Sequence, residues 1–272
     1  MPDGGYTVII ITEGEDDAKL IGAVLERKGW EKERGGESER TWCRGPHRVR
    51  VLPSERGKGG RANIPFWVRT HRAQTRYFII LFDPDEHDPN DVVADLWHKI
   101  WTKLNENLSE SEDLSSNIKR VRDRDGWEGL LIFLSLMLSP EKFPDNIRNL
   151  IFSTSSAHNM MDYVLYMGLQ NDVLQALLEK DSSLRSSERL SVDRFQDKFR
   201  EILQLLRNQG VGIESSKRAM DFYHALLGYR AGLGKLGACM VQYLREETLN
   251  ELFEEFLSTL EKILQSEIVD RS

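Results

Sequence analysis

The sequence of 272 residues predicts an α/β fold with a mainly parallel sheet flanked by helices. Two apolar, β-branched runs of strand length, residues 6–12 and 77–82, are each followed by an amphipathic helical pattern. Neither run alternates with polar residues, as is typical of strands that are covered on both faces. Beyond about residue 172 the periodicity is helical only. We therefore expect an α/β domain over residues 1–172 and a helical C-terminal region over residues 173–272.

The first strand, residues 6–12, ends at Glu13-Gly14, and Asp16 or Asp17 is expected to cap a helix that stops at Gly29. A polar stretch then predicts a loop or a ragged hairpin. The next elements are a short strand, a flexible turn and a short helix with a proline in its first turn, at residues 49–52, 57–60 and 64–72.

The second buried strand, residues 77–82, ends at Asp83-Pro-Asp85, after which Asp91 is expected to cap a long amphipathic helix. The following segments predict a polar loop, a helix and a further strand, over residues 105–116, 127–138 and 147–153. Strands that alternate with helices indicate parallel pairing, with ligands at the carboxyl ends of the strands. Acidic residues follow both buried strands, and they are expected to come together if these strands are neighbours in the sheet.

The helical C-terminal region closes with a wide apolar stripe over residues 249–264. This stripe is consistent with a homodimer face, and also with a helix that packs on its own chain.

Composition excludes several classes of protein. A hydrophobic fraction of 40% and a charged fraction of 30% are typical of a globular chain. Cys43 and Cys239 are too few for a disulfide framework or a cysteine zinc site. The longest apolar run, residues 130–138, is too short to cross a bilayer, so no membrane partner is expected. The N-terminal residues lack the pattern of a signal peptide, which makes the cytoplasm the expected location.

One segment has a charge opposite in sign to that of the whole chain. The chain has a formal charge of −7, but residues 40–76 contain ten basic residues and only one acidic residue, Glu55. The planar guanidinium group of arginine binds phosphate well, so this segment predicts contact with nucleic acid. The candidate residues for this contact are Arg44, Arg48, Arg50, Arg56, Lys58 and Arg61. The alternative is a surface whose arginines pair with acidic neighbours.

The acidic residues at the strand ends suggest a metal site. Glu13, Asp17, Asp83 and Asp85 repel one another at close range unless a cation or a proton neutralises them. Oxygen ligands without nearby His or Cys favour Mg²⁺ or Mn²⁺, which also bind phosphate oxygens. Each acid taken alone is also consistent with a helix cap or a turn.

A family resemblance enters at these residues. The stretch 11–17, with Glu13, Gly14 and Asp17, resembles the E-G-x-x-D signature of Toprim domains, and Asp83-Pro-Asp85 resembles their D-x-D. Residues 57–65 resemble the glycine-rich turn of small stand-alone prokaryotic Toprim-related proteins. The chain is also similar to the Toprim part of OLD-type nucleases.

The resemblance implies a role for each of these acids. It implies that Glu13 is a general acid or base and that Asp83 and Asp85 hold Mg²⁺. It also implies that Asp17 is a further metal-binding or structural acid.

Three functions follow as hypotheses. The first is a Mg²⁺-dependent nuclease that acts on DNA or RNA. The second is a non-catalytic module that binds nucleic acid or takes part in an assembly. The third is another α/β enzyme, or a receiver-like phosphoacceptor with Asp83 as the modified residue.

Overall fold

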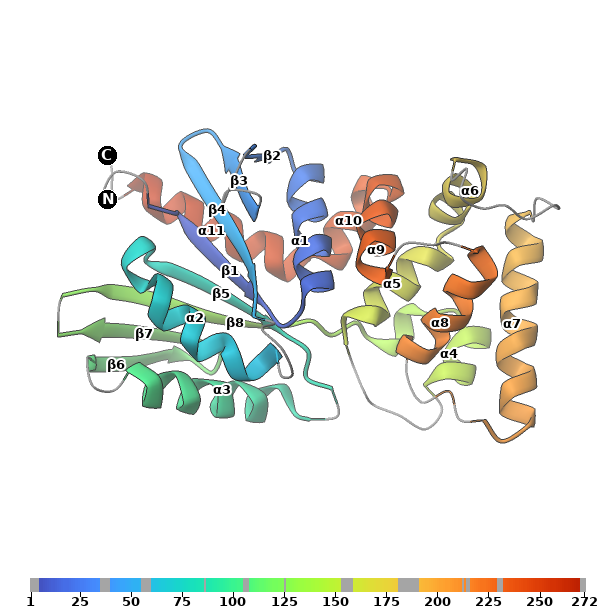
Figure 1. Ribbon diagram of the computed structural model, residues 1–272, viewed down its shortest axis with the longest axis horizontal. Coiled ribbons are helices and arrows are strands. Elements are labelled where there is room, and N and C mark those ends of the chain that lie inside the picture. The colour runs from blue at the N-terminus through green and yellow to red at the C-terminus, as the bar shows by residue number, and fades with distance from the viewer. Residues whose placement is uncertain are drawn as a thin grey trace. The chain divides into compact units, whose positions relative to one another are not determined.

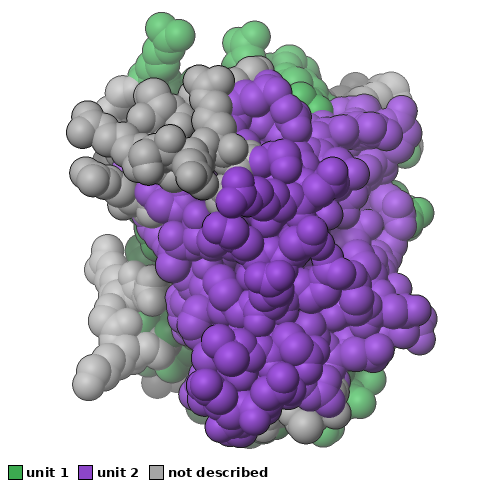
Figure 2. Space-filling model, turned by 90° about the vertical axis from the view of Figure 1, so that its right-hand side faces the viewer, with its two compact units in different colours: residues 1–82, 87–135, 253–272 green, residues 83–86, 136–252 purple. Residues whose placement is uncertain are grey.

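The structure is a computed structural model of the chain, and contacts divide it into two compact units (Figure 2). The first unit comprises residues 1–82, 87–135 and 253–272, and the second comprises residues 83–86 and 136–252. The boundary near residue 172 that the sequence predicts, between an α/β domain and a helical region, stays a prediction. The described residues are 5–34, 40–54, 60–85, 87–104, 108–124, 126–152, 159–180, 191–211, 213, 216–228 and 232–269.

The first unit is built on a mixed sheet of eight strands in the order β2-β3-β4-β1-β5-β8-β7-β6 (Figure 1). The strands are β1 Val8–Thr12, β2 Glu31–Lys32, β3 Thr41–Arg44, β4 His47–Pro53, β5 Tyr77–Phe82, β6 Leu108–Ser115, β7 Ile118–Asp123 and β8 Glu128–Ser135. Only the central pairs β4–β1, β1–β5 and β5–β8 are parallel, and the pairs on either side of them are antiparallel. The α/β class is confirmed, but the expectation of a mainly parallel sheet is wrong.

Helices cover both faces of this sheet. Helices α2 (Ile64–His71) and α3 (Pro89–Leu104) share a core with Ile9, Phe78 and Phe133 on one face. Helix α1 (Glu15–Arg27) and the closing helix α11 (Glu254–Val269) lie on the other face (Figure 1). Opposite sides for α1 and α2 are expected, because the crossovers that contain them run in opposite directions along the sheet. Crossovers between parallel strands are right-handed as a rule. Double coverage explains why β1 is buried at every position.

The two buried strands that precede the acidic motifs are neighbours, as expected. Residues 9–11 of β1 pair in parallel with residues 78–80 of β5. Both strands therefore end at the same edge of the sheet, which we call the carboxyl edge. Helix α1 stops before Gly29, where a φ of 80° suits the absence of a Cβ.

Three predicted elements are wrong. The expected loop over residues 105–116 contains β6, a polar edge strand. The expected helix over residues 127–138 contains β8, whose apolar run lacks alternation because both of its faces are covered. The expected strand over residues 147–153 overlaps α4 (Asp145–Ile151).

The second unit is helical in its described part beyond residue 136, as expected for the later chain. Besides α4 and the short 3-10 helix Pro140–Lys142, its helices are α5 Met160–Leu169, α6 Asn171–Lys180, α7 Val192–Asn208, α8 Ser216–Leu227, α9 Leu233–Tyr243 and α10 Glu246–Leu252. Helix α11 belongs to the first unit instead, where Phe256, Leu260 and Leu264 are buried. The apolar stripe of α11 therefore packs on its own chain.

Candidate functional site

The E-G-x-x-D motif forms the start of α1. Gly14 is the N-cap, and its N–H donates to Oδ2 of Asp17 at 2.8 Å. The expectation that Asp16 or Asp17 is the cap is therefore wrong, although a carboxylate in the first turn of a helix is favourable there. Only 8% of Asp17 is exposed, so its carboxylate serves the turn between β1 and α1.

Glu13, the predicted acid or base, lies at the carboxyl edge in an ion pair. Its Oε1 accepts a hydrogen bond from Nε of Arg61 at 2.8 Å, and the two side chains are 19% and 24% exposed. Arg61 belongs to the 3-10 helix Gly60–Asn63, which precedes α2. The candidate base and one candidate phosphate ligand are thus partners in this structure.

The backbone holds this pair in place. The hydroxyl of Ser54 donates to the carbonyl oxygens of both Glu13 and Gly60. A Cβ on Gly60 would lie 2.4 Å from the Glu13 carbonyl oxygen, so only glycine permits this approach. Sequence reasoning missed Ser54 and the approach at Gly60. The glycine-rich stretch is a signal for a close backbone contact, but it does not identify the partner.

The D-x-D motif belongs to the second unit. Oδ1 of Asp83 accepts a hydrogen bond from the backbone N–H of Met160, the first residue of α5, at 3.0 Å. Asp162 is fully buried at the same helix start, where it accepts from the Asn159 N–H at 3.2 Å and from the Ser216 hydroxyl. Asp85 is exposed and has a φ of 54°. Glu13 and the D-x-D motif thus belong to different compact units.

Most of the described arginines in the basic segment pair with carboxylates distant in sequence. The pairs are Arg40 with Glu15, Arg44 with Glu261, Arg48 with Glu33, Arg61 with Glu13 and Arg72 with Asp123. This is the alternative arrangement that the sequence left open. Five of the eight described arginines of the segment are therefore paired within the chain.

Two candidates, Arg48 and Arg50, share one face of β4. Both guanidinium groups lie over the Tyr6 ring, 5.1 and 5.3 Å from its centre. The hydrogen bond with Glu33 raises the pKa of Arg48. Arg44 is directed elsewhere, over the Trp30 ring at 4.8 Å. Arg56 and Lys58 lie outside the described residues.

The donor set has the chemistry of a hard-cation site, because the candidates offer carboxylate oxygens only. In the described ranges, however, no three His, Cys, Asp or Glu side chains are gathered as ligands of one metal ion. The carboxylates of Glu13, Asp17 and Asp83 are engaged by Arg61, Gly14 and Met160.

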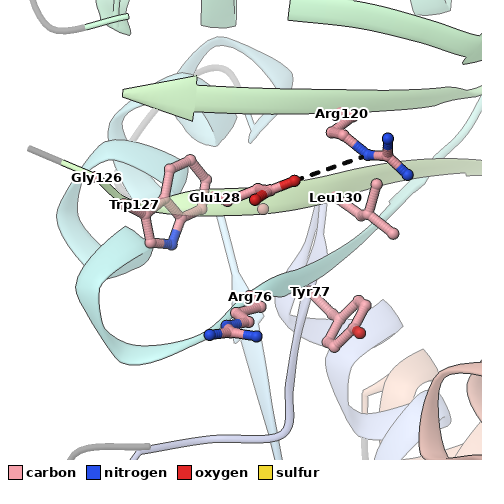
Figure 3. A pocket seen from close by; sticks show the side chains of 8 residues that line it. Arg76, Tyr77, Arg120, Gly126, Trp127, Glu128 and Leu130 are labelled. Carbon is pink, nitrogen blue, oxygen red and sulfur yellow. Dashed lines mark ion pairs between the residues drawn. The ribbon is translucent and has the colours of Figure 1, made fainter. Parts of the chain in front are cut away.

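A separate pocket of about 520 Å³ lies at the amino ends of β5 and β8, which we call the amino edge (Figure 3). The side chains of Arg76, Tyr77, Trp127 and Glu128 line it. Sequence reasoning placed ligands at the carboxyl ends only and treated Arg76 as one of ten basic residues. No motif marks this pocket, because its residues come from separate strand starts.

Comparisons with known proteins add no relationship. No family model matches the chain, and searches of curated proteins and of solved structures found no match. Within the described residues, no helix combines the length and the hydropathy that crossing a bilayer requires.

Proposed function

We propose that this protein is a Mg²⁺-dependent nuclease of the Toprim type that acts on DNA or RNA. The observation that carries the proposal is the parallel pairing of β1 with β5. Glu13 follows the carboxyl end of β1, and Asp83 follows the carboxyl end of β5. Ligands of α/β proteins bind at this edge of the strands.

The backbone of Asp85 supports the proposal. Among the described residues, Asp85 is the single non-glycine residue with a positive φ. This conformation costs an L-residue roughly 1–2 kcal/mol, although aspartate tolerates it better than most. Backbone strain of this kind clusters at functional sites. A strained aspartate within the D-x-D motif is therefore consistent with a functional carboxylate.

Each acid has a separate part in the proposal. Asp83 and Asp85 would hold Mg²⁺ or Mn²⁺, while Asp17 supports the turn that carries Glu13. The metal ion, when bound, would stabilise negative charge on the phosphate oxygens. Glu13 would relay a proton once Arg61 has exchanged its carboxylate for a phosphate of the substrate.

The test is cleavage of labelled DNA and RNA by the purified chain with Mg²⁺ or Mn²⁺. Asp83→Asn keeps an oxygen that accepts from Met160, and Glu13→Gln keeps an oxygen for Arg61, so both variants remove charge with little effect on packing. We expect each to lose at least about 100-fold in rate. Asp95→Asn is the matched control, since Asp95 is an exposed residue of α3 that pairs with Lys99. Equal cleavage by all variants would refute the assignment.

A second candidate is a non-catalytic module that binds nucleic acid. The ion pair between Glu13 and Arg61 favours it, because a base held by arginine is less available for proton transfer. This function predicts nucleic-acid binding that weakens steeply with salt and no metal-dependent turnover. Fluorescence polarisation with a labelled oligonucleotide, measured over a range of salt concentrations, distinguishes the two candidates when paired with the cleavage assay.

A further inference from the structure

The pocket at the amino edge belongs wholly to the first unit and lies away from the acidic motifs. It opens where β5 and β8 begin, whereas Glu13 follows the other end of the parallel strands. A strand of six residues such as β5 is about 20 Å long, which separates the two edges. The volume of the pocket, about 520 Å³, is within the usual range for small-ligand sites.

The lining of this pocket is net positive because of Arg76. Glu128 is neutralised by Arg120 and Arg122, with N–O distances of 3.9 and 3.3 Å. Arg120 also pairs with Glu112 at 3.0 Å. Arg76 is exposed and has no acidic partner among the described residues. An anionic group is therefore the ligand group that this cation would attract without breaking an existing ion pair.

The indole of Trp127 forms the aromatic part of the pocket. The indole N–H of Trp127 donates to the Thr75 carbonyl oxygen at 2.9 Å, and its ring packs edge-on against Phe78 at 6.4 Å between centres. A Cβ on Gly129 would lie 2.3 Å from the indole ring, so the glycine makes room for it. In the view of Figure 3, Trp127 and Glu128 lie above Arg76 and Tyr77. The indole is thus fixed before any ligand arrives.

We propose that the amino-edge pocket binds a nucleotide, with its phosphate on Arg76 and its base against the indole of Trp127. A free nucleoside monophosphate and the phosphorylated end of a strand offer the same chemistry. Bases of every type present an apolar aromatic face, so the indole favours a base without selecting one. The site is distinct from the proposed metal site and does not depend on it.

The test is calorimetry on the full chain with AMP as ligand, in EDTA so that a metal-dependent site does not contribute. Adenosine and inorganic phosphate, measured alone, are each expected to bind at least about ten-fold more weakly than AMP, because each lacks one half of the ligand. A short oligonucleotide with a 5′ phosphate distinguishes the sources: tighter binding than AMP indicates a strand end, and weaker binding indicates a free nucleotide. If neither AMP nor the 5′-phosphorylated oligonucleotide binds saturably, the proposal is overturned.

Two variants locate the site. Arg76→Gln should weaken AMP binding about ten-fold or more through loss of charge-assisted hydrogen bonds, and Gly129→Ala should weaken it by displacing the indole. Arg69→Gln is the matched control, because Arg69 is an exposed arginine of α2 outside the pocket. Unchanged affinity in Arg76→Gln, or an equal loss in Arg69→Gln, would show that the phosphate is not held at this pocket. The outcome of the nuclease test does not change how the AMP-binding result is interpreted, because the two experiments probe different sites.

Discussion

The two edges of the sheet in the first unit differ in how their charged side chains are paired. At the carboxyl edge, Glu13 pairs with Arg61 and Asp17 accepts from the backbone of Gly14. At the amino edge, Arg76 is exposed beside a pocket and has no acidic partner among the described residues. A ligand at the carboxyl edge must therefore replace an ion pair, whereas an anion at the amino edge adds to an uncompensated charge.

The difference shows that the number of basic residues in a segment does not measure its capacity for phosphate. Arg44, Arg48 and Arg61 belong to one basic run, yet each has a carboxylate partner. Pairing of exposed groups is worth about 1 kcal/mol or less, so a phosphate can compete for such an arginine. The two edges differ in the free-energy cost of phosphate binding. At the carboxyl edge a phosphate must first replace the carboxylate partner of the arginine, and at the amino edge it replaces none.

The largest expected effect is on the backbone that holds the carboxyl edge. Gly60→Ala should lower the free energy of unfolding by about 2–3 kcal/mol, because its Cβ would lie 2.4 Å from the Glu13 carbonyl oxygen. Urea denaturation measures the change. Gly232→Ala is the control, since a Cβ there meets no atom within 4 Å. A Gly60→Ala protein as stable as this control would mean that the turn does not pack on Glu13.

The next effect compares an arginine from each edge. Arg61→Gln should cost about 1 kcal/mol, because it leaves the mostly buried carboxylate of Glu13 without its guanidinium partner. Arg76→Gln should change stability by less than about 0.5 kcal/mol, because the side chain is exposed. The two variants are compared by urea denaturation at low and high salt, and equal losses would remove the contrast between the edges.

A smaller effect concerns the loop that follows β5. Asp85→Gly should raise stability by about 0.5–1 kcal/mol, because glycine adopts a φ of 54° without steric cost. The same variant should lose metal-dependent cleavage. A gain in stability with full activity would show that the strain serves no function in the motif, and a loss of stability would argue against the strain itself.

The last effect is a pH dependence that involves His71 of α2. Burial lowers the pKa of His71 below 6.5. The hydrogen bond with Gln74 opposes this shift, and the charge of Arg50 adds a smaller lowering. As the pH falls below 6.5, the unfolded chain takes up a proton before the folded chain does, so stability is lost toward acid. The slope for one proton is at most about 1.4 kcal/mol per pH unit. Urea midpoints on both sides of pH 6.5 should change less in His71→Gln than in the wild type.

The sequence predicts β1 and β5 well, because burial on both faces leaves a run of apolar residues such as that of β1. The same physics misleads at β8, where the sequence EGLLIFLS has no period that separates a buried strand from a buried helix. Strand β6 is missed for the opposite reason. Its residues 111–115 are exposed at the edge of the sheet, so its pairing with β7 leaves no hydrophobic pattern.

The candidate acids are predictable as strand-end residues, but their partners are not. Arg61 reaches Glu13 across 48 positions, and Met160 reaches Asp83 across 77. Such contacts depend on how loops pack, which no local pattern encodes. The amino-edge pocket has the same origin, since Arg76 and Trp127 come from the starts of different strands.

Binding of Mn²⁺, followed by electron paramagnetic resonance, tests the proposed metal site most directly. The wild-type chain should bind the ion saturably, and Asp83→Asn and Asp85→Asn should each weaken binding by about ten-fold or more, because each removes a charged oxygen ligand. Asp95→Asn should bind as the wild type does. Equal Mn²⁺ affinity in all four proteins would contradict the assignment of the D-x-D motif as a metal site.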